Sequence, residues 1–378
     1  AKPDITTNKN GIYYFNMNST EYTSHPFRLS DHGELATLAS NEAPMGLFDK
    51  KIVGIASDGT KVVSLSEDGE IYDNDDLVVR SLGQTANNWE SKSIDGTAKI
   101  KSVAYSPELR LYVGVGNAEE IWYSYDLREW TQSSRTPNAA NDLRSVIWSA
   151  EKFLFMAVGT NGIILTSPTG IGNDWTVRDT GITLTDIHQE VIWAKESELF
   201  IIVGSNSAGT SGRIYSSPDG ITWTSRTSNI SVNLNGVHWS ADVGIYVAVG
   251  NGGALTTSSD GISWTARSSG TSNTLNAISC SYYNGVSTFL AIGATQTALT
   301  STDGLTWATR VTGTTGELTD LIWDADNLTF KITDVNGKVI TTDQDAQTYT
   351  DISVAGHRLD RIVYSGFTYF VFSGDGGL

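Results

Sequence analysis

The phrase Ser-x-Asp-Gly-x-x-Trp brings together the side chains of this 378-residue chain that are best suited to chemistry. Each copy offers a hydroxyl, a carboxylate and an aromatic ring, and hydrolytic sites use the first two of these groups. Intact copies of the phrase occur at 217–223, 258–264 and 301–307. Weaker copies end at Trp89, Trp130, Trp175 and Tyr349. An active site is needed once, whereas a turn must be stabilised in every repeat. The repetition therefore favours a structural role.

In that structural role, the aspartate accepts hydrogen bonds from nearby backbone N–H groups and so stabilises a turn. The glycine after it supplies a positive φ, and the tryptophan packs its ring back under the turn. The residues assigned to this role are Asp219, Trp223, Asp260, Trp264, Asp303 and Trp307.

The seven anchor aromatics are spaced 41 to 48 residues apart, a period typical of stacked supersecondary units. The copy at 234–268 shows the content of one unit. Its predicted strands are 236–239, 245–250, 254–257 and one that begins at Trp264. Four antiparallel strands in about 43 residues are the content of a propeller blade, so the sequence predicts an all-β propeller.

The first strand of this unit recurs eight times, at Ile55, Tyr105, Trp148, Trp193, Trp239, Ser279, Trp323 and Tyr364. The chain stops where the third strand of an eighth unit would begin, and residues 11–25 match a third and a fourth strand. We therefore expect one domain, residues 1–378, forming an eight-bladed ring, with seven blades as the alternative. Residues 11–25 would close the ring, 26–50 form a crossover, 51–358 hold seven consecutive blades, and 359–378 begin the closing blade.

The three intact phrases resemble the Asp-box, or BNR repeat, of sialidases and many other propellers. They lack one residue of the sialidase spacing. This shorter form is similar to repeats in bacterial and bacteriophage propellers of the photosystem-assembly-factor type. The resemblance implies the propeller fold but no single activity, because Asp-box proteins include hydrolases, binding modules and structural parts.

Composition narrows the class of partner. The net charge of −17 disfavours nucleic acid and anionic membrane surfaces. No apolar run is long enough to suggest membrane insertion, and the start lacks an apolar signal segment. Cys280 is the single cysteine, so no internal disulfide can form.

Signals for catalysis are weak. Phe27-Arg28-Leu29-Ser30 is a distant echo of the sialidase N-terminal motif, without two further arginines that can be placed beside it. There is no Gly-x-Ser-x-Gly elbow, the histidines lack paired metal spacing, and acidic clusters at 73–76 and 324–327 fit solvated turns. We expect no enzymatic activity, no cofactor and no metal.

A ligand is expected at one mouth of the axial channel, where aligned copies place one residue per blade. These residues are Lys51, Lys101, Arg144, Gln189, Asn235, Asn276, Thr319 and Asp360. The basic members come from the first three blades, which suits a surface with one positive sector; a water-filled channel is the alternative. Loops on the same face add Glu119, Glu120 and Arg213. Four arginines three residues after an anchor tryptophan are expected to shield the outer edge: Arg178, Arg226, Arg267 and Arg310.

The predicted function is a non-enzymatic binding or structural propeller, more specifically a bacteriophage tail, fibre or capsid-surface protein. It would be made in the host cytoplasm, reside in the virion, and contact another virion protein or a host surface. Its partner would be a protein or a cell-surface glycan. The alternatives are a cytoplasmic bacterial assembly or scaffolding factor and a sialidase-like glycoside hydrolase.

Overall fold

The computed structural model describes residues 100–125, 130–178, 185–325 and 327–351 with their side chains, together with Ile362. For further strands it describes only the backbone. The chain divides into two compact units, residues 1–88 with 366–368 and residues 89–365 with 369–378.

In the first unit the described strands form three small antiparallel sheets. Their strands are β1 (Asp4–Thr7) with β2 (Tyr13–Asn16), β3 (Phe27–Leu29) with β4 (Leu35–Thr37), and β5 (Ile52–Ser57), β6 (Val62–Ser66) and β7 (Ile71–Asp73).

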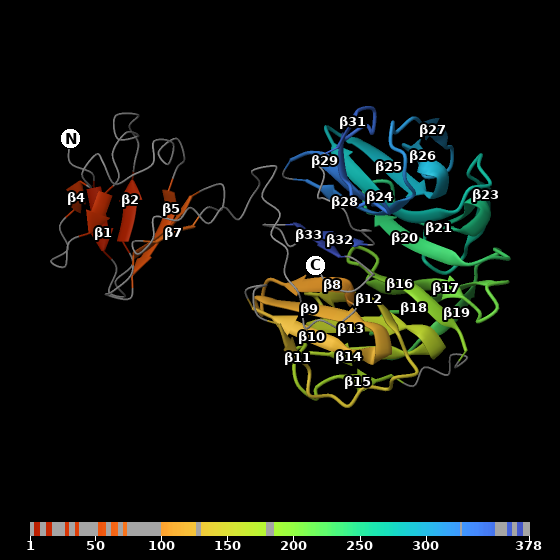
Figure 1. Cartoon of the computed structure of the whole chain (residues 1–378), viewed down its shortest axis with the longest axis horizontal. Coiled ribbons are helices and arrows are strands. Elements are labelled where there is room, and N and C mark those ends of the chain that lie inside the picture. Colours follow the sequence, from red (N-terminus) through yellow and green to blue (C-terminus); the bar gives the residue numbers. More distant parts are fainter. Residues whose placement is uncertain are drawn as a thin grey trace. The chain divides into compact units, whose positions relative to one another are not determined.

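The second unit is a six-bladed propeller in which each blade is a four-stranded antiparallel sheet, with the strands in chain order (Figure 1). The first three blades contain β8 (Ile100–Ser106), β9 (Leu111–Gly116), β10 (Ile121–Ser124) and β11 (Thr131–Gln132); β12 (Leu143–Ser149), β13 (Leu154–Gly159), β14 (Ile164–Ser167) and β15 (Thr176–Val177); and β16 (Ile187–Ala194), β17 (Leu199–Ser205), β18 (Gly212–Ser217) and β19 (Thr224–Thr227).

The other three blades contain β20 (Leu234–Ser240), β21 (Ile245–Gly250), β22 (Ala254–Ser258) and β23 (Thr265–Ser268); β24 (Leu275–Tyr283), β25 (Val286–Gly293), β26 (Ala298–Ser301) and β27 (Ala308–Arg310); and β28 (Leu318–Asp324), β29 (Thr329–Asp334), β30 (Val339–Asp343) and β31 (Tyr349–Asp351). Short 3₁₀ turns join second and third strands at η2 (Asn117–Glu119), η3 (Thr160–Gly162), η4 (Asn251–Gly253) and η5 (Ala294–Gln296). None of the helices in the described part of the chain has the length and apolar character needed to span a membrane.

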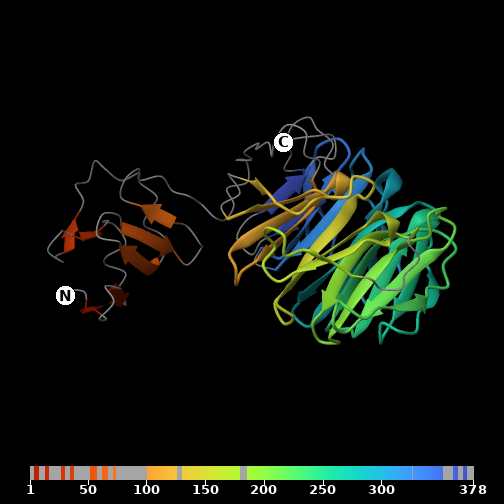
Figure 2. The same cartoon turned by 90° about the horizontal axis from the view of Figure 1, so that it is seen from below.

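The first strands of neighbouring blades contact one another and line the inside of the ring, as Figures 1 and 2 show. A two-stranded sheet of β32 (Arg361–Tyr364) and β33 (Tyr369–Phe372) lies between the sixth and the first blade. Its strand β32 contacts β28 on one side and β8 on the other. This hairpin therefore completes the inner wall of the propeller.

The predicted all-β propeller with four-stranded antiparallel blades is confirmed, but the predicted number of blades, eight or seven, is wrong. The first predicted repeat, β5 to β7, is a three-stranded sheet that belongs to the other compact unit. The last one, β32 and β33, has two strands. Six sheets of four strands remain.

The predicted closure by N-terminal strands is also wrong. Strand β2, from the segment expected to close the ring, pairs instead with β1, from Asp4↔Asn16 to Thr7↔Tyr13, and among the described strands the β32–β33 sheet has two members. A short strand with alternating apolar and polar residues can pair with the edge of many sheets, so its sequence alone does not select its partner strand.

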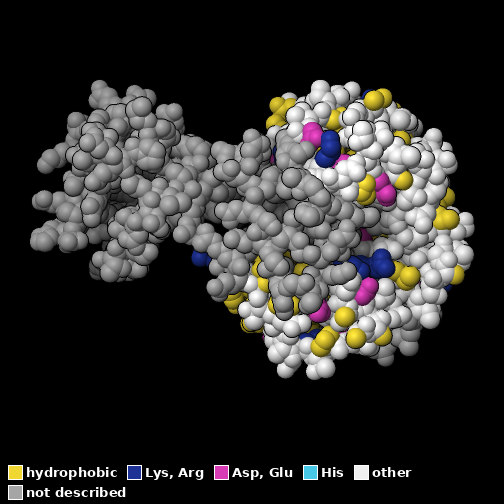
Figure 3. Space-filling model, viewed as in Figure 1, with side chains coloured by type: hydrophobic (Ala, Val, Ile, Leu, Met, Phe, Trp, Pro, Cys, Tyr) yellow, Lys and Arg dark blue, Asp and Glu magenta, His cyan; other side chains and the backbone are white. Residues whose placement is uncertain are grey.

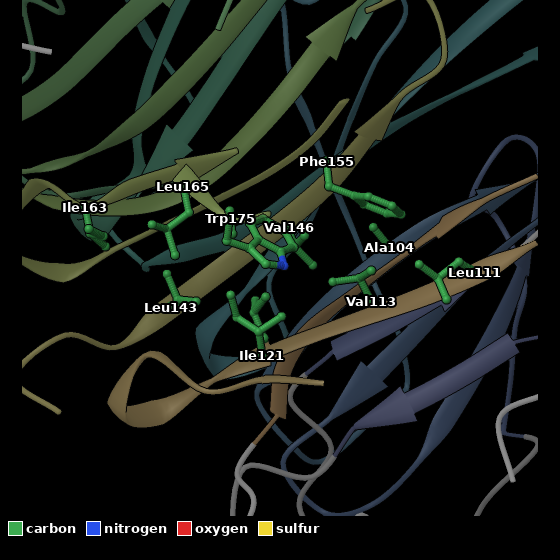
Figure 4. Packing of buried hydrophobic residues seen from close by; sticks show 12 residues of the cluster. Ala104, Leu111, Val113, Ile121, Leu143, Val146, Phe155, Ile163, Leu165 and Trp175 are labelled. Carbon is green, nitrogen blue, oxygen red and sulfur yellow. The ribbon is translucent and has the colours of Figure 1, made fainter. Parts of the chain in front are cut away.

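The hydrophobic core lies between blades, because each sheet buries both of its faces against its neighbours. Figure 4 shows one such layer, in which Trp175 and Phe155 of the second blade pack against Val113 and Ile121 of the first. The second strand of each blade is buried along nearly its whole length, as in β21. The fourth strands are mostly exposed, and β23 is exposed throughout.

Candidate functional site

A β-bulge interrupts the first strand of every blade at the same place. The register skips one residue in each of the six pairs of first and second strands, at Lys101, Arg144, Gln189, Asn235, Asn276 and Thr319. These are six of the eight residues that the sequence places at the channel mouth. A bulge leaves one residue outside the ladder and re-aims its side chain. The structure thus repeats one special position on the inner strand of each blade.

The bulges lie at the end of the propeller where the second-to-third turns meet the connections between blades. Asn251 N–H, in η4, donates to the carbonyl of Asn233 at 3.0 Å, and Thr160 N–H, in η3, donates to the carbonyl of Asp142 at 2.9 Å. Charged side chains of both signs lie around the middle of the ring on the face shown in Figure 3.

In four of the six blades the residue after the bulge ties its blade to the next first strand. In four places its side chain accepts a hydrogen bond from a backbone N–H of the following first strand: Ser102 from Val146 (3.2 Å), Ser145 from Val191 (3.3 Å), Glu190 from Val237 (2.7 Å) and Asp320 from Ile362 (3.0 Å). Gly236 and Ala277 stand at this position in the fourth and fifth blades, and there the bulge residue itself makes the connection. Asn235 and Asn276 donate from Nδ2 to the carbonyls of Leu275 and Leu318, both at 2.8 Å.

Sequence reasoning missed these connecting residues, because they face a neighbouring blade rather than the channel. The signal that could have found them is a serine or acidic residue directly after the aligned bulge position, at Ser102, Ser145, Glu190 and Asp320.

In the basic sector of the mouth, each cation contacts a side chain of the next blade. Lys101 Nζ lies 3.1 Å from Asp142 Oδ2, and Arg144 donates to Gln189 Oε1 at 2.9 Å. Burial acts to raise the pKa of Asp142, but a hydrogen bond from Ala118 N–H, together with Lys101 and Arg144, holds that pKa below its usual value. The carboxylate therefore stays ionised and pairs with the partly buried Lys101 at the rim, and it also interacts with the charge of Arg144.

The rest of the mouth is mostly uncharged. Asn235 also donates to Asn251 Oδ1 at 3.0 Å, and Asn276 donates to Glu317 Oε1 at 2.9 Å. The hydroxyl of Thr319 lies 2.9 Å from that of Thr333. The mouth thus carries one sector with cations and another with amides and hydroxyls.

The loop residues predicted beside the mouth take different places. Glu119 is only 2% exposed, with Arg135 2.9 Å away, so it organises the loop beneath it. Arg213 is about one third exposed and its Nε lies 3.2 Å from the buried carboxylate of Asp186. Glu120 follows η2 and is partly exposed. Lys51 and Asp360 lie outside the described residues.

The Ser-x-Asp-Gly-x-x-Trp phrases form turns at the opposite end of the blades. In 217–223, Asp219 Oδ1 accepts hydrogen bonds from the backbone N–H groups of Ile221 (2.8 Å) and Thr222 (2.7 Å). The Trp223 indole donates to the carbonyl of Gly220 at 3.3 Å. Gly220 has φ of 72°, and a Cβ built there would lie 2.7 Å from Met156 Cε of the preceding blade. The turn therefore needs glycine for its backbone conformation, whereas the flexible end of Met156 could move aside.

The copies at 258–264 and 301–307 repeat this geometry. The N–H groups of Ile262 and Ser263 donate to Asp260, both within 2.8 Å, and those of Leu305 and Thr306 donate to Asp303 at 2.8 Å. For Asp260 the bond from Ser263 is the largest influence and helps to lower the pKa to about 2. At Asp303 burial opposes the shift, but the bonds from Thr306 and Leu305 bring the pKa to about 2 as well. Both carboxylates are engaged with their own turns.

The outer arginines bond within their own blades. Arg178, Arg226, Arg267 and Arg310 each donate from Nε to a hydroxyl of the third strand, at distances of 2.7 to 3.1 Å. These bonds fix the arginine side chains to the outer two strands of each blade, where they were expected to shield the edge.

No group of three or more potential metal ligands occurs among the described residues. In the acidic cluster at 324–327, Asp324 is fully buried and accepts hydrogen bonds from the N–H and the amide of Asn327, at 3.1 and 2.7 Å. Its carboxylate shapes the turn between β28 and β29.

Asp320→Ala tests how the β32–β33 hairpin is held in the ring. We expect the free energy of unfolding to fall by about 1–3 kcal/mol, because the buried N–H of Ile362 loses its acceptor. Hydrogen exchange should accelerate in Arg361–Tyr364 and Tyr369–Phe372 before it does so in the six blades. Ser102→Ala is the matched control, since it removes the equivalent bond between the first two blades. Equal exchange of the hairpin in both variants would contradict this role of Asp320.

Comparison with known proteins supports the propeller fold at the level of structure but not at the level of sequence. No family model matches the chain, and no curated protein matches it. Solved structures do match. One is "YCF48 bound to D1 peptide", with a TM-score of 0.60 and 16% identity, covering 77% of this chain and 95% of that one. The chain shares the β-propeller fold. Another match is "YCF48 from Cyanidioschyzon merolae", with a TM-score of 0.58 and 17% identity, covering 76% and 97%. At such identities the likeness concerns the fold alone.

Proposed function

We propose that this protein is a non-enzymatic binding propeller that holds an extended segment of a partner protein across its channel mouth. The observation that carries the proposal is the ring of bulge residues. Six blades present one polar side chain each at the same rim, and the cations are confined to one sector. Such a ring is directional, as recognition of a peptide with a defined orientation requires.

The chemistry of the rim indicates how a peptide would lie. Lys101 and Arg144 would attract a carboxylate, either an acidic side chain or a chain terminus, and Arg is well suited to that geometry. The amides of Asn235 and Asn276 can hydrogen-bond to peptide groups further along. The similar propeller YCF48 is described as bound to a peptide of D1, so this fold can accept a segment of another protein.

Binding to a peptide array sorted by net charge tests the proposal. We expect the protein to select acidic peptides, and the double variant Lys101→Gln, Arg144→Gln to bind the best of them at least tenfold more weakly. A hydrogen bond to a charged group contributes about 1.5–3 kcal/mol, and about 1.4 kcal/mol corresponds to a factor of ten.

Arg267→Gln with Arg310→Gln is the matched control, because it removes the same charge from outer strands. Thermal unfolding of each variant shows whether the fold is retained. If the outer-strand variant lost binding as strongly as the mouth variant, or no acidic peptide bound, the proposed site would be wrong.

The setting in which the propeller acts is a further part of the proposal. The acidic charge and the polar blades support a bacteriophage virion protein made in the host cytoplasm, bound to another virion protein or to a host-surface protein or glycan. A cytoplasmic assembly factor is the second candidate, favoured by the structural likeness to YCF48. Mass spectrometry of purified particles distinguishes the two, since only a virion component copurifies in fixed ratio to the capsid protein. A sialidase-like hydrolase would release the fluorophore from an aryl sialoside, and we expect no release.

A further inference from the structure

A tryptophan–carboxylate pair connects neighbouring blades on the face opposite the channel mouth. The indole N–H of a first strand donates to a glutamate in the first-to-second turn of the preceding blade. Three junctions have this pair: Trp148 with Glu108 (2.7 Å), Trp193 with Glu151 (2.9 Å) and Trp239 with Glu196 (3.0 Å). In each case the carboxylate stands three residues after the aromatic position of its own blade.

The fifth blade departs from this pattern. Counting four residues from the bulge leads to Trp239 in the fourth blade and to Cys280 in the fifth. The sequence alignment placed Ser279 there, one residue too early. The preceding blade still supplies a carboxylate at the expected position, Asp242. The acceptor is therefore kept at this junction while the indole is absent.

The aromatic partner of the missing indole is also kept. Elsewhere the first-strand aromatic packs on a ring of the second strand, as Trp239 packs on Tyr246 with centroids 4.3 Å apart. At the fifth blade Cys280 is paired with Phe289. Burial is the main cause that raises the pKa of the Cys280 thiol to about 11, and the charge of Asp242 adds to it. The thiol is thus neutral and near Asp242. It donates to Ser240 Oγ at 3.7 Å and to the carbonyl of Ser281 at 3.4 Å, and it is much smaller than an indole.

A surface pocket of about 320 Å³ lies at this junction. It is lined by Asp242 and Val243 of the fourth blade, and by Tyr282, Val286 and Ser287 of the fifth, among others. Among the described residues, the Asp242 side chain has no hydrogen bond or ion pair. The pocket therefore combines an available carboxylate with the apolar side chains of Val243 and Val286 and the ring of Tyr282, beside the hydroxyls of Ser287 and Thr302.

The fifth blade also extends the rim of this pocket. Its first hairpin has two pairs beyond the usual end, Tyr282↔Ser287 and Tyr283↔Val286. A tight turn at Asn284 and Gly285 closes it, both with positive φ. Tyr282 and Val286 are 51% and 52% exposed, and Tyr283 is 37% exposed. Tyr283 and Val286 are directly paired and share one face of the hairpin, and Tyr282 lies on the other, so both faces of this hairpin expose apolar area that a partner could contact.

We propose that this junction is a docking site for a tryptophan side chain on an exposed segment of a partner protein. The chain itself shows which side chain suits the place, because three equivalent junctions are occupied by an indole that donates to a carboxylate. A partner's indole would donate to Asp242 and pack against Tyr282 and Val286. Tryptophan is among the residues that most often anchor protein interfaces, since it buries a large ring and satisfies one polar group.

The test uses N-acetyl-tryptophanamide as the probe and amide NMR shifts as the readout. We expect saturable shifts in the backbone amides of Val243, Val286 and Ser287 of the intact protein. Cys280→Trp should place an internal indole in the pocket and weaken probe binding at least tenfold, whereas Cys280→Ser should leave it unchanged. Asp242→Ala should also weaken binding at least tenfold, because the acceptor is lost.

Two further measurements keep the result decisive. Val286→Glu alters only the exposed hairpin, so it should weaken binding even if Cys280→Trp does not fold. N-acetyl-phenylalaninamide, which lacks the indole N–H, should bind at least tenfold more weakly than the tryptophan probe. The proposal is overturned if the tryptophan amide causes no saturable shifts, if both amides bind equally, or if folded Cys280→Trp binds the probe as the natural protein does.

Discussion

Trp264→Ala is expected to lower the free energy of unfolding by about 3–5 kcal/mol, the range for truncating a large buried aromatic side chain. Trp264 is 4% exposed and belongs to the apolar cluster between the third and fourth blades. Its ring centroid lies 5.9 Å from that of Tyr246, and its N–H donates to the carbonyl of Gly261 at 3.3 Å. Truncation would leave a cavity between two sheets and also release the turn.

Urea unfolding followed by intrinsic fluorescence measures this effect. Ile262→Ala is the matched control, because Ile262 lies on the same turn but is half exposed, and surface substitutions usually change stability by less than about 0.5 kcal/mol. If both substitutions lowered the free energy of unfolding by the same small amount, Trp264 would not contribute to the core between blades.

Stability is expected to fall as the pH decreases from about 6.5 to about 4, and His188 is expected to account for about 3 kcal/mol of that fall. His188 is fully buried. Burial lowers its pKa from 6.5 to about 4, although Asp186 and the hydrogen bond to the carbonyl of Ile163 act in the other direction. The unfolded chain binds a proton at higher pH than the folded one. The contribution of His188 to the free energy of unfolding is therefore complete above pH 6.5 and is lost as the pH falls through its folded pKa of about 4.

The surroundings of His188 define the control. Its ring meets that of Tyr215 edge-on at 5.5 Å, and the cluster also contains Asp186 and Arg213. His188→Phe keeps the ring contact and removes the titration, so unfolding measured across this pH range should show a shallower slope. His238, whose pKa burial also lowers to about 4, retains its share of the slope in that variant. An unchanged slope in His188→Phe would show that His188 does not couple folding to pH.

The strands of each repeat follow closely from the sequence. Predicted second strands such as Leu111–Gly116 and Ile245–Gly250 coincide with β9 and β21, because continuous apolar runs bounded by turn residues have few other solutions. The aligned positions Lys101, Arg144, Gln189, Asn235, Asn276 and Thr319 are the bulge residues of the six blades. Aligning the repeats identifies structurally equivalent residues, although the sequence does not show that these residues form β-bulges.

Other features required the tertiary structure. Glu119 reads as a loop residue beside the mouth but is buried against Arg135. Cys280 reads as an inner-strand thiol, and only the bulge register shows that it replaces a tryptophan. Trp148 and Glu108 are forty residues apart in the chain, so no local pattern joins them.

The sequence by itself determined the propeller class, the four-stranded blade and the positions of its strands and turns, since hairpins depend on neighbours in the chain. The tertiary structure decided that six blades have four strands and that β32 and β33 complete the inner wall. Those outcomes depend on pairing and packing between distant segments, where many short strands offer equivalent edges and only the assembled ring selects among them.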